Sequence, residues 1–331
     1  MPEVAITDDY VNAKYNSDIE AWGDRGWATV RCLCRWAAAN SMSHPDCPTP
    51  SWWASFGMDL ASENGHRYDA TMVEVAPART EPSPLRRFVE VATRNVILRS
   101  HLPEKYGRRP IYISPGNALR FLKPGDAKFD PILLWMVDKF VKPGTTVWDI
   151  GANGGVFSAL AATVAKTVVA FEPDPFNVAL IDRTRKANPD LDIRLCAAAL
   201  SDRSGEIALN IPQRGRSVAS IDGIPMGGES GGLRNSVTVQ TKTADQCLDE
   251  YPHPSFIKCD IEGAEALLLE GATRLLSEVR PVICMEVRDT TADDVAAAFR
   301  RHSYTLHSSD DEMRALDDIR DACDVIAVPQ S

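Results

Sequence analysis

The sequence has no excess of positive charge, no long apolar run and no recognisable export signal. Its 331 residues include 36 Lys and Arg against 46 Asp and Glu, a net charge of −10. This balance disfavours an electrostatic grip on nucleic acid or on an anionic membrane. The longest apolar stretches, such as ILLWMV at 132–137, have the length of a buried helix face rather than of a membrane span. The N-terminal MPEVAITDDY lacks the basic and apolar parts of a signal peptide.

The cysteines do not indicate a disulfide framework or a metal site. Eight cysteines in a chain of this length, several inside predicted strands, indicate buried free thiols and hence a reducing compartment. We therefore predict a cytoplasmic protein. Cys32, Cys34, His44 and Cys47 could offer zinc ligands, but their spacing fits no common zinc pattern. Cys32 and Cys34 also fall in a predicted helix, where residues two apart face different sides.

The composition changes near residue 85. Residues 1–85 hold five of the seven tryptophans, a predicted helix at 17–39 and a Pro/Ser-rich stretch. APARTEPSP at 76–84 is typical of a connection, because paired prolines and small polar residues resist regular structure. We predict a mainly helical N-terminal extension over 1–85, acting as a lid, an acceptor-binding element or a dimer contact. Residues 86–331 form the predicted catalytic domain.

Beyond residue 85 the hydrophobic pattern alternates between strands and helices. Asp130 and Pro131 predict the start of one helix, as N-cap and first helical residue. Alternation of this kind predicts an α/β fold, with a parallel sheet covered by helices on both faces. The predicted helices are 84–100, 131–141, 155–165, 176–187, 264–277 and 291–301; the predicted strands are 110–113, 145–150, 167–171, 192–198, 237–241, 256–260, 281–287, 303–308 and 323–328.

A glycine-rich loop follows the first strand of the predicted core. VWDIGANGGVFS at 147–158 passes from strand through loop to helix, and Glu172 ends the next strand, twenty-one residues after Gly151. Open α/β sheets bind ligands at this edge, and an acid there can accept both hydroxyl hydrogens of a ribose. The sequence therefore predicts a nucleoside-bearing cofactor.

The loop favours a cationic cofactor over a pyrophosphate. Asn153 replaces the second glycine of a dinucleotide loop, and Asp149 stands two residues before the first glycine. A carboxylate there repels a pyrophosphate but suits S-adenosylmethionine, which carries an ammonium and a sulfonium. Asp149-x-Gly151-x-Asn153-x-Gly155 resembles motif I of the class I methyltransferases that use this cofactor.

Further segments narrow the resemblance to one family. Five ordered motifs together resemble the FkbM methyltransferases, over about residues 110–287: DIGANGG at 149–155, FEPDPFN at 171–177, AALSDRSGEIAL at 198–209, VASI at 218–221 and IKCDIEGAE at 257–265. The resemblance implies a Rossmann-like, doubly wound sheet of seven strands whose last strand is antiparallel.

The resemblance also implies roles for single residues. Asp149, Gly151, Asn153 and Gly154 would line the methionine half of S-adenosylmethionine, with Asp260 near the methionine moiety and the transferred methyl. At the nucleoside end, Glu172 would hold the ribose hydroxyls, Pro173 would turn the chain beside it, and Ala199 and Leu200 would meet the adenine.

FkbM relatives resemble O-methyltransferases that act on hydroxyls of sugars or natural-product scaffolds. The implied partner is a small hydroxylated acceptor, whose proton must be shared with a base. Asp260 and Glu286, at carboxyl ends of predicted strands, are the leading candidates, and Lys258 alternates with Asp260 on one strand. The pattern does not decide whether Lys258 lies beneath the same site. His101 and His307 are weaker candidates.

Other features leave alternatives open. Asp260, Glu262 and Glu286 could bind Mg²⁺ or Ca²⁺, although nothing in their spacing requires it, and Glu262 and Glu265 also suit the first turn of a helix. The glycine-rich segment 210–236 is either a solvated loop or a mobile flap.

If the segment 210–236 is a mobile flap, its Arg214, Arg216 and Arg234 would bind a carboxylate or phosphate on the acceptor.

Two other functions remain compatible with the loop. An NAD(P)-dependent oxidoreductase would use the same strand, loop and ribose acid, but Asp149 and Asn153 oppose it, and no hydride-transfer pair of Tyr/Lys or His is evident. A non-catalytic binding partner with the same fold is the other alternative. The intact cofactor loop argues against it.

Overall fold

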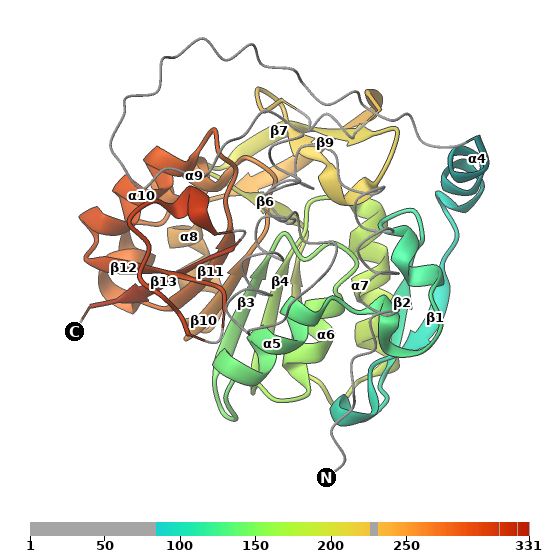
Figure 1. The fold of residues 1–331 in the computed structure, drawn as a ribbon, viewed down its shortest axis with the longest axis horizontal. Helices are drawn as coiled ribbons and strands as arrows, with labels where there is room; N and C mark the ends of the chain where they lie inside the picture. The colour runs from blue at the N-terminus through green and yellow to red at the C-terminus, as the bar shows by residue number, and fades with distance from the viewer. Residues whose placement is uncertain (1–83, 226–230, 311, 323, 331) are drawn as a thin grey trace, which may run out of the picture. The chain divides into compact units, whose positions relative to one another are not determined.

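The computed structural model describes residues 84–225, 231–310, 312–322 and 324–330 (Figure 1). The predicted N-terminal extension, its tryptophans and the candidate zinc ligands lie outside the described residues. The extension and the domain boundary at residue 85 therefore stay predictions.

A seven-stranded sheet forms the centre of the described domain. Its order is β12-β13-β11-β10-β3-β4-β5, in which β3, β4, β5, β10 and β11 are parallel and β13 is antiparallel to both of its neighbours. The predicted sheet with an antiparallel last strand is confirmed. The bounds are β3 Thr146–Ile150, β4 Thr167–Phe171, β5 Ile193–Cys196, β10 Phe256–Cys259, β11 Val282–Glu286, β12 Tyr304–Ser308 and β13 Asp324–Pro329.

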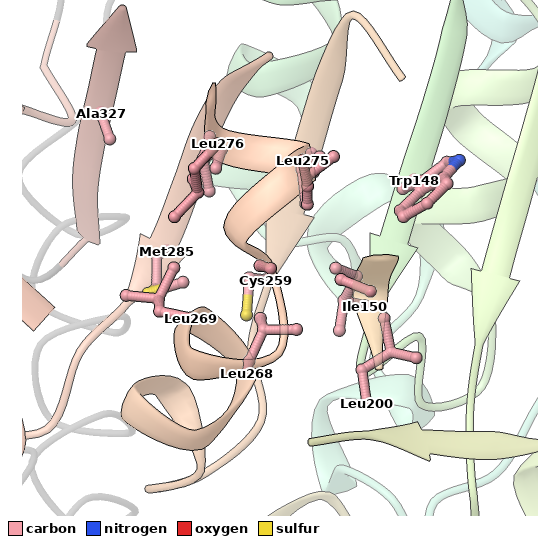
Figure 2. Packing of buried hydrophobic residues seen from close by; sticks show 14 of the residues in the cluster. Trp148, Ile150, Leu200, Cys259, Leu268, Leu269, Leu275, Leu276, Met285 and Ala327 are labelled. Carbon is pink, nitrogen blue, oxygen red and sulfur yellow. The ribbon is translucent and has the colours of Figure 1, made fainter. Parts of the chain in front are cut away.

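Helices cover both faces of this sheet. On one face α5 and α6 share a hydrophobic cluster with Val147, Phe256 and Cys284, and on the other α8, α9 and α10 pack with Trp148 and Ile257. Figure 2 shows the second cluster. Strand neighbours fall in opposite clusters because side chains alternate along a strand. The bounds are α5 Pro131–Phe140, α6 Val156–Ala162, α7 Pro175–Ala187, α8 Ala244–Glu250, α9 Glu265–Glu270, a π-helix η6 Leu275–Val279, and α10 Ala292–Arg301.

The predicted helix start at Asp130 is confirmed. The Asp130 side chain accepts a hydrogen bond from the backbone N–H of Ile132, and Pro131 occupies the first turn. The remaining short helices are η1 Glu104–Tyr106, η2 Leu119–Leu122, η3 Gly125–Lys128, η4 Arg216–Val218 and η7 Ile319–Asp321. Within the described ranges, no helix is both long and apolar enough to cross a bilayer.

The prediction of one helix over 84–100 is wrong in its second half. Helix α4 covers Pro84–Thr93, and the chain then forms strand β1 Leu98–His101, which pairs antiparallel with β2 Pro110–Ile113. The stretch preceding β1 contains Val96 and Ile97, whose β-branched side chains favour extended backbone. Pairing with β2 satisfies the backbone groups that a helix would otherwise bond.

A second sheet replaces much of the predicted irregular segment. Its order is β6-β9-β7-β8, with β6 Ala198–Leu200, β7 Gly205–Pro212, β8 Ser220–Ile221 and β9 Leu233–Lys242. The predicted strand 192–198 is thus divided between β5 and β6, and β9 begins earlier than the predicted 237. The sequence did not predict strand β7, although Ile207, Leu209 and Ile211 recur at every second position and pack in the apolar cluster of this sheet. Figure 1 shows this sheet, in yellow, beyond the ends of β3 and β4.

Candidate functional site

The glycine loop after β3 is held tightly against both neighbouring strands. Gly151 has φ +73° and Asn153 φ +54°, the left-handed region. The backbone N–H groups of Gly151 and Ala152 both donate to the carbonyl of Phe171, each over 3.0 Å. On the other side, an added Cβ on Gly151 would lie 2.0 Å from the carbonyl oxygen of Asp260. The loop therefore requires glycine here both for its backbone angle and for this close approach.

We expect Gly151→Ala to lose the folded site. The new Cβ would meet backbone rather than a flexible side chain, so the loop or β10 must shift. Gly144→Ala is the matched control, because Gly144 also has a positive φ, +84°, but nothing lies within 4 Å of an added Cβ. The control should cost about 1 kcal/mol of unfolding free energy, and Gly151→Ala several-fold more, measured by chemical denaturation. Equal costs would show that the loop moves freely away from β10.

Glu172 at the end of β4 is joined to the glycine loop. Its Oε2 accepts the backbone N–H of Asn153 over 2.7 Å, and its Oε1 accepts the N–H of Asp174 over 2.8 Å. The side chain is 5% exposed. Burial raises the pKa of Glu172 to about 8, against the lowering effect of these amide donors. The predicted ribose acid therefore lies at the expected edge of the sheet and is bound to the residue that replaces the second glycine.

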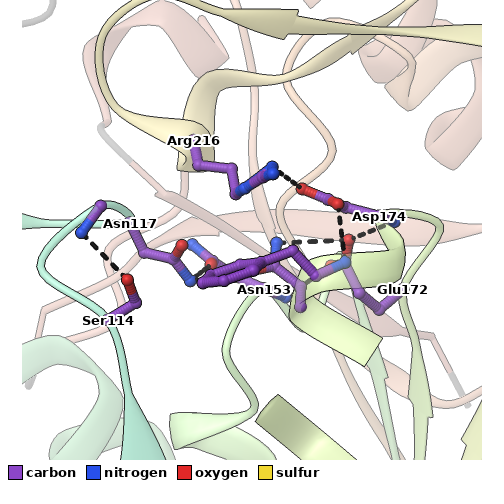
Figure 3. A network of polar contacts seen from close by, with 9 residues as sticks. Ser114, Asn117, Asn153, Glu172, Asp174 and Arg216 are labelled. Carbon is purple, nitrogen blue, oxygen red and sulfur yellow. Dashed lines mark hydrogen bonds and ion pairs between the residues drawn. The ribbon is translucent and has the colours of Figure 1, made fainter. Parts of the chain in front are cut away.

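Asn117, which the sequence did not single out, connects the loop to α7. Its Nδ2 donates to Asn153 Oδ1 over 2.5 Å and to Asn177 Oδ1 over 2.9 Å (Figure 3). Its own Oδ1 is buried and has no hydrogen-bond partner among the described residues. Nothing in the segment after β2 marks Asn117 in advance, since its contacts come from positions far away in the chain.

Arg216 lies over the same region, on η4. Its guanidinium is 3.2 Å from Asp174 Oδ2 and stacks on the ring of Phe176, with 4.6 Å between the guanidinium carbon and the ring centroid. Figure 3 shows Arg216 above Glu172 and Asn153. Burial raises the pKa of Asp174, and the Arg216 charge opposes that rise. Of the arginines predicted to meet an acceptor anion, Arg216 contacts Asp174, whose N–H bonds to the predicted ribose acid Glu172, and Arg214 is paired with Glu90 at 2.9 Å.

Lys258 lies beneath the site between two acids. Its Nζ is 3.8 Å from Asp149 Oδ1 and 3.4 Å from Asp260 Oδ2. Asp149 is fully buried and accepts the Ser158 hydroxyl over 2.6 Å. Burial opposes the charge of Lys258, but Asp260 and Asp149 raise its pKa well above the usual value. Burial likewise raises the pKa of Asp149, and Lys258 and Ser158 oppose the rise. The structure thus decides the open question: Lys258 lies on the same face as Asp260.

Two further carboxylates reach this edge of the sheet. Glu286 ends β11, and Asp324, which the sequence did not single out, begins β13 directly opposite it in the register. Asp324 reaches the carboxyl edge because β13 runs antiparallel. Burial and the Asp260 carboxylate raise the pKa of Asp324 to about 7. Asp260 is thus in ion-pair contact with Lys258, and Glu286 and Asp324 lie near enough to interact with its charge.

The metal alternative has no support in the described residues. The side chain of Glu262 bonds to Arg288 at 2.8 Å, and Glu265 accepts the N–H of Gly263 and the Thr291 hydroxyl. These contacts turn both acids toward the structure around α9. In the described part of the chain, no group of three or more His, Cys, Asp or Glu could hold a metal ion.

The remaining residues predicted for the site differ in burial and in distance from the glycine loop along the fold. Pro173 lies between Glu172 and Asp174, partly buried. Ala199 and Leu200 are in β6, and their side chains lie in separate hydrophobic clusters, which leaves mainly backbone atoms for a ligand. The ring nitrogens of His307, in the edge strand β12, are hydrogen-bonded to the Met313 carbonyl and the Thr305 hydroxyl. His101 is an exposed residue of β1.

The sheet order, with the glycine loop after its central strand, defines the class I methyltransferase architecture. The model of the FkbM methyltransferase domain matches residues 149–319, more than half of the chain. The chain therefore belongs to the FkbM methyltransferase family.

Known proteins with partial similarity include one curated enzyme and several solved structures. The hexuronic acid methyltransferase AglP of Haloferax volcanii is 31% identical over 142 residues, 41% of this chain and 54% of AglP. The chain thus spans about half the length of this relative. The FkbM methyltransferase structure from Methylobacillus flagellatus is 16% identical, covering 56% of this chain and 43% of its own, with a TM-score of 0.37. A 16S rRNA N2 methyltransferase from T. thermophilus, solved with AdoMet and guanosine, is 13% identical, covering 71% and 51%, with a TM-score of 0.41.

Proposed function

We propose that this protein transfers a methyl group from S-adenosylmethionine to a hydroxyl of a small acceptor, such as a sugar or a natural-product scaffold. The observation that carries the proposal is the bond between Glu172 and the N–H of Asn153, at the carboxyl ends of neighbouring strands β3 and β4. This bond holds Glu172, the proposed ribose acid, beside the loop in which Asn153 stands in place of a dinucleotide glycine.

The residues present fit the donors and charges of S-adenosylmethionine. Asn117 Oδ1 is a buried acceptor without a partner among the described residues, beside Asn153 and Asn177, and suits an N–H or O–H donor of the cofactor. Around Lys258, carboxylates outnumber ammonium groups and suit the cofactor's two positive charges. Bound S-adenosylmethionine would supply an electrophilic methyl group on a sulfonium.

The chain's own residues position the partners and accept a proton. Lys258 holds its proton firmly, so we assign it the positioning of Asp149 and Asp260 rather than the role of base. Asp260 and Glu286 stay candidates for the base. Asp324 is a third candidate, because a carboxyl with a pKa of about 7 can both accept and release a proton near neutral pH.

The acceptor class is supported by the curated relative. AglP is named as a methyltransferase of a hexuronic acid, and we propose an acidic sugar as the first acceptor to test. The four described cysteines are buried free thiols, which supports the prediction of a cytoplasmic location. A homodimer stays a prediction.

Calorimetry with S-adenosylmethionine, S-adenosylhomocysteine and NADH tests the cofactor. We expect micromolar binding of the two sulfur nucleosides and none of NADH. Tight NADH binding would instead support the oxidoreductase. Mass spectrometry of incubated sugars then tests transfer, and alkaline hydrolysis separates the products, since it removes a methyl ester but leaves a methyl ether on a hydroxyl. Turnover would exclude the non-catalytic alternative.

We expect the affinity for S-adenosylmethionine to rise with pH between about 6 and 8. Because the pKa of Glu172 is raised to about 8, its carboxyl is mainly protonated at pH 6, whereas two ribose hydroxyls require the ionised form. Binding must therefore release a proton, and the affinity should rise by up to about tenfold per pH unit and level off above pH 8. Calorimetry in buffers of different ionisation enthalpy measures this release. Binding that stays flat in pH would show that Glu172 is already ionised in the free protein.

A further inference from the structure

Three arginines from distant parts of the chain lie near one another, and one of them contacts Asp174, which is bonded to Glu172. Arg94 follows α4, Arg216 begins η4 and Arg234 is in β9. We call these three residues the arginine cluster. Arg94 Nη2 donates to the carbonyl of Gln213 over 2.9 Å, and the Gln213 N–H donates to the carbonyl of Gly232 over 2.9 Å. These contacts bring Arg94 to the end of the β7–β9 hairpin.

The loop that contains Gly116 contacts both Arg94 and Arg216. The Arg216 N–H donates to the carbonyl of Gly116 over 3.0 Å, and an added Cβ on Gly116 would lie 2.4 Å from the carbonyl oxygen of Arg94. Gly116 therefore lies against the backbone of Arg94 and is hydrogen-bonded to Arg216. The same loop continues to Asn117, which contacts Asn153 in the glycine loop.

The cluster has more positive than negative charge. Arg214 is neutralised by Glu90 through two hydrogen bonds, of 2.9 and 3.0 Å. Among the described residues, the one carboxylate in ion-pair contact with the cluster is Asp174, which meets Arg216. Burial lowers the pKa of Arg234, and the nearby charges of Arg216 and Arg94 lower it further, so Arg234 is repelled by both.

Two guanidinium nitrogens of the cluster are buried without a partner in the described part of the chain. Arg94 Nε and Arg216 Nε have no hydrogen-bond partner among the described residues, whereas Arg216 Nη1 faces Asp174 Oδ2 at 3.2 Å. Buried donors are costly to leave unsatisfied, and most in folded proteins are paired. Stacking on Phe176 fixes the plane of the Arg216 guanidinium, so its donors are already oriented. A planar guanidinium matches the two oxygens of a carboxylate or phosphate.

We propose that Arg94, Arg216 and Arg234 form a binding site for an anionic group, a carboxylate or a phosphate, on the methyl acceptor. An oxygen ligand there would satisfy the orphaned donors and offset the mutual repulsion of the arginines. The site adjoins the cofactor site, because Asp174 joins Arg216 to Glu172 through its side chain and its N–H. The assignment of the anion to the acceptor rests on the proposed function.

Binding of simple sugars to the full-length protein tests the site. The probes are glucuronic acid, glucose 1-phosphate and glucose, each titrated in the presence of S-adenosylhomocysteine and followed by ligand-observed NMR. We expect one or both anionic sugars to bind at least tenfold more tightly than glucose, and more weakly at higher salt. A preference between glucuronic acid and glucose 1-phosphate identifies the anion as carboxylate or phosphate.

Variants assign the binding to the cluster. Arg234→Gln should lower the affinity for the anionic sugar at least tenfold, while the affinity for S-adenosylhomocysteine stays within about twofold. Arg203→Gln is the matched control, since Arg203 is 85% exposed and pairs only loosely with Asp202, at 3.7 Å. Equal binding of glucose and the anionic sugars, no binding of either anionic sugar, or an unaffected Arg234→Gln variant would overturn the proposal. Failure of S-adenosylhomocysteine to bind would instead count against the proposed function.

Discussion

We expect Glu172→Gln to weaken the binding of S-adenosylmethionine by about 30-fold or more, which corresponds to roughly 2 kcal/mol. Both carboxylate oxygens of Glu172 already accept backbone N–H groups, from Asn153 and Asp174. A glutamine must turn its own N–H₂ toward one of these donors, so it loses that hydrogen bond and also one acceptor for the ribose. Calorimetry on the purified variant measures the change.

Two comparisons make this expectation specific. Glu206→Gln changes an exposed acid on β7 that bonds to Gln240, and its affinity should match that of the wild type. The rise of affinity between pH 6 and 8 should also disappear in Glu172→Gln, because the titrating carboxyl has been removed. Wild-type affinity in Glu172→Gln would mean that the ribose is held elsewhere.

We expect Lys258→Met to destabilise the domain by about 3–5 kcal/mol, because it leaves the Asp149 carboxylate buried without its cation. Asp149 is fully buried, and Lys258 is the positive group beside it, at 3.8 Å. In a domain of this size the loss corresponds to a fall in Tm of about 10 °C. Urea unfolding followed by circular dichroism gives the free energy directly.

Two control variants distinguish the cost of a buried unpaired charge from the cost of losing a lysine. Lys105→Met removes an ion pair with Asp138 whose lysine side chain is 65% exposed, and it should cost at most about 1 kcal/mol. The double variant Asp149→Asn/Lys258→Met removes both charges and should recover much of the stability lost in Lys258→Met. If the double variant is no more stable than Lys258→Met, the cost comes from packing and not from an unpaired charge.

The sequence predicted the parts of the fold that depend on local pattern. The alternation of strands and helices, the cap at Asp130 and the glycine loop after β3 follow from hydrophobic period, capping chemistry and the needs of a left-handed backbone. The seven-stranded sheet with its antiparallel last strand was implied by the family resemblance. The helix predicted across 94–100 failed because pairing with β2, a contact between separate segments, outweighs the local preference.

The sequence predicted the candidate site residues that stand at the carboxyl ends of parallel strands and missed those that lie elsewhere. Asp260 and Glu286 stand at carboxyl ends of strands, so position alone points to them. Asp324 precedes its strand and reaches the same edge only because β13 is antiparallel. Asn117 and Arg94 belong to connecting segments, and their contacts with Asn153 and Gln213 depend on how those segments cross the sheet edge. Nothing in their sequence neighbourhood indicates such contacts.

Asp174 contacts two neighbourhoods, the arginine cluster through its carboxyl and the surroundings of Glu172 through its backbone N–H. Its side chain meets Arg216, and its N–H is bound to Glu172. We expect a ligand in one of these neighbourhoods to change the field at Asp174 and thereby to affect the other. Thermodynamic reciprocity then requires that the acceptor anion alter cofactor affinity by the same factor by which the cofactor alters anion affinity. We therefore expect the two ligands to bind cooperatively, with a single residue as the coupling element.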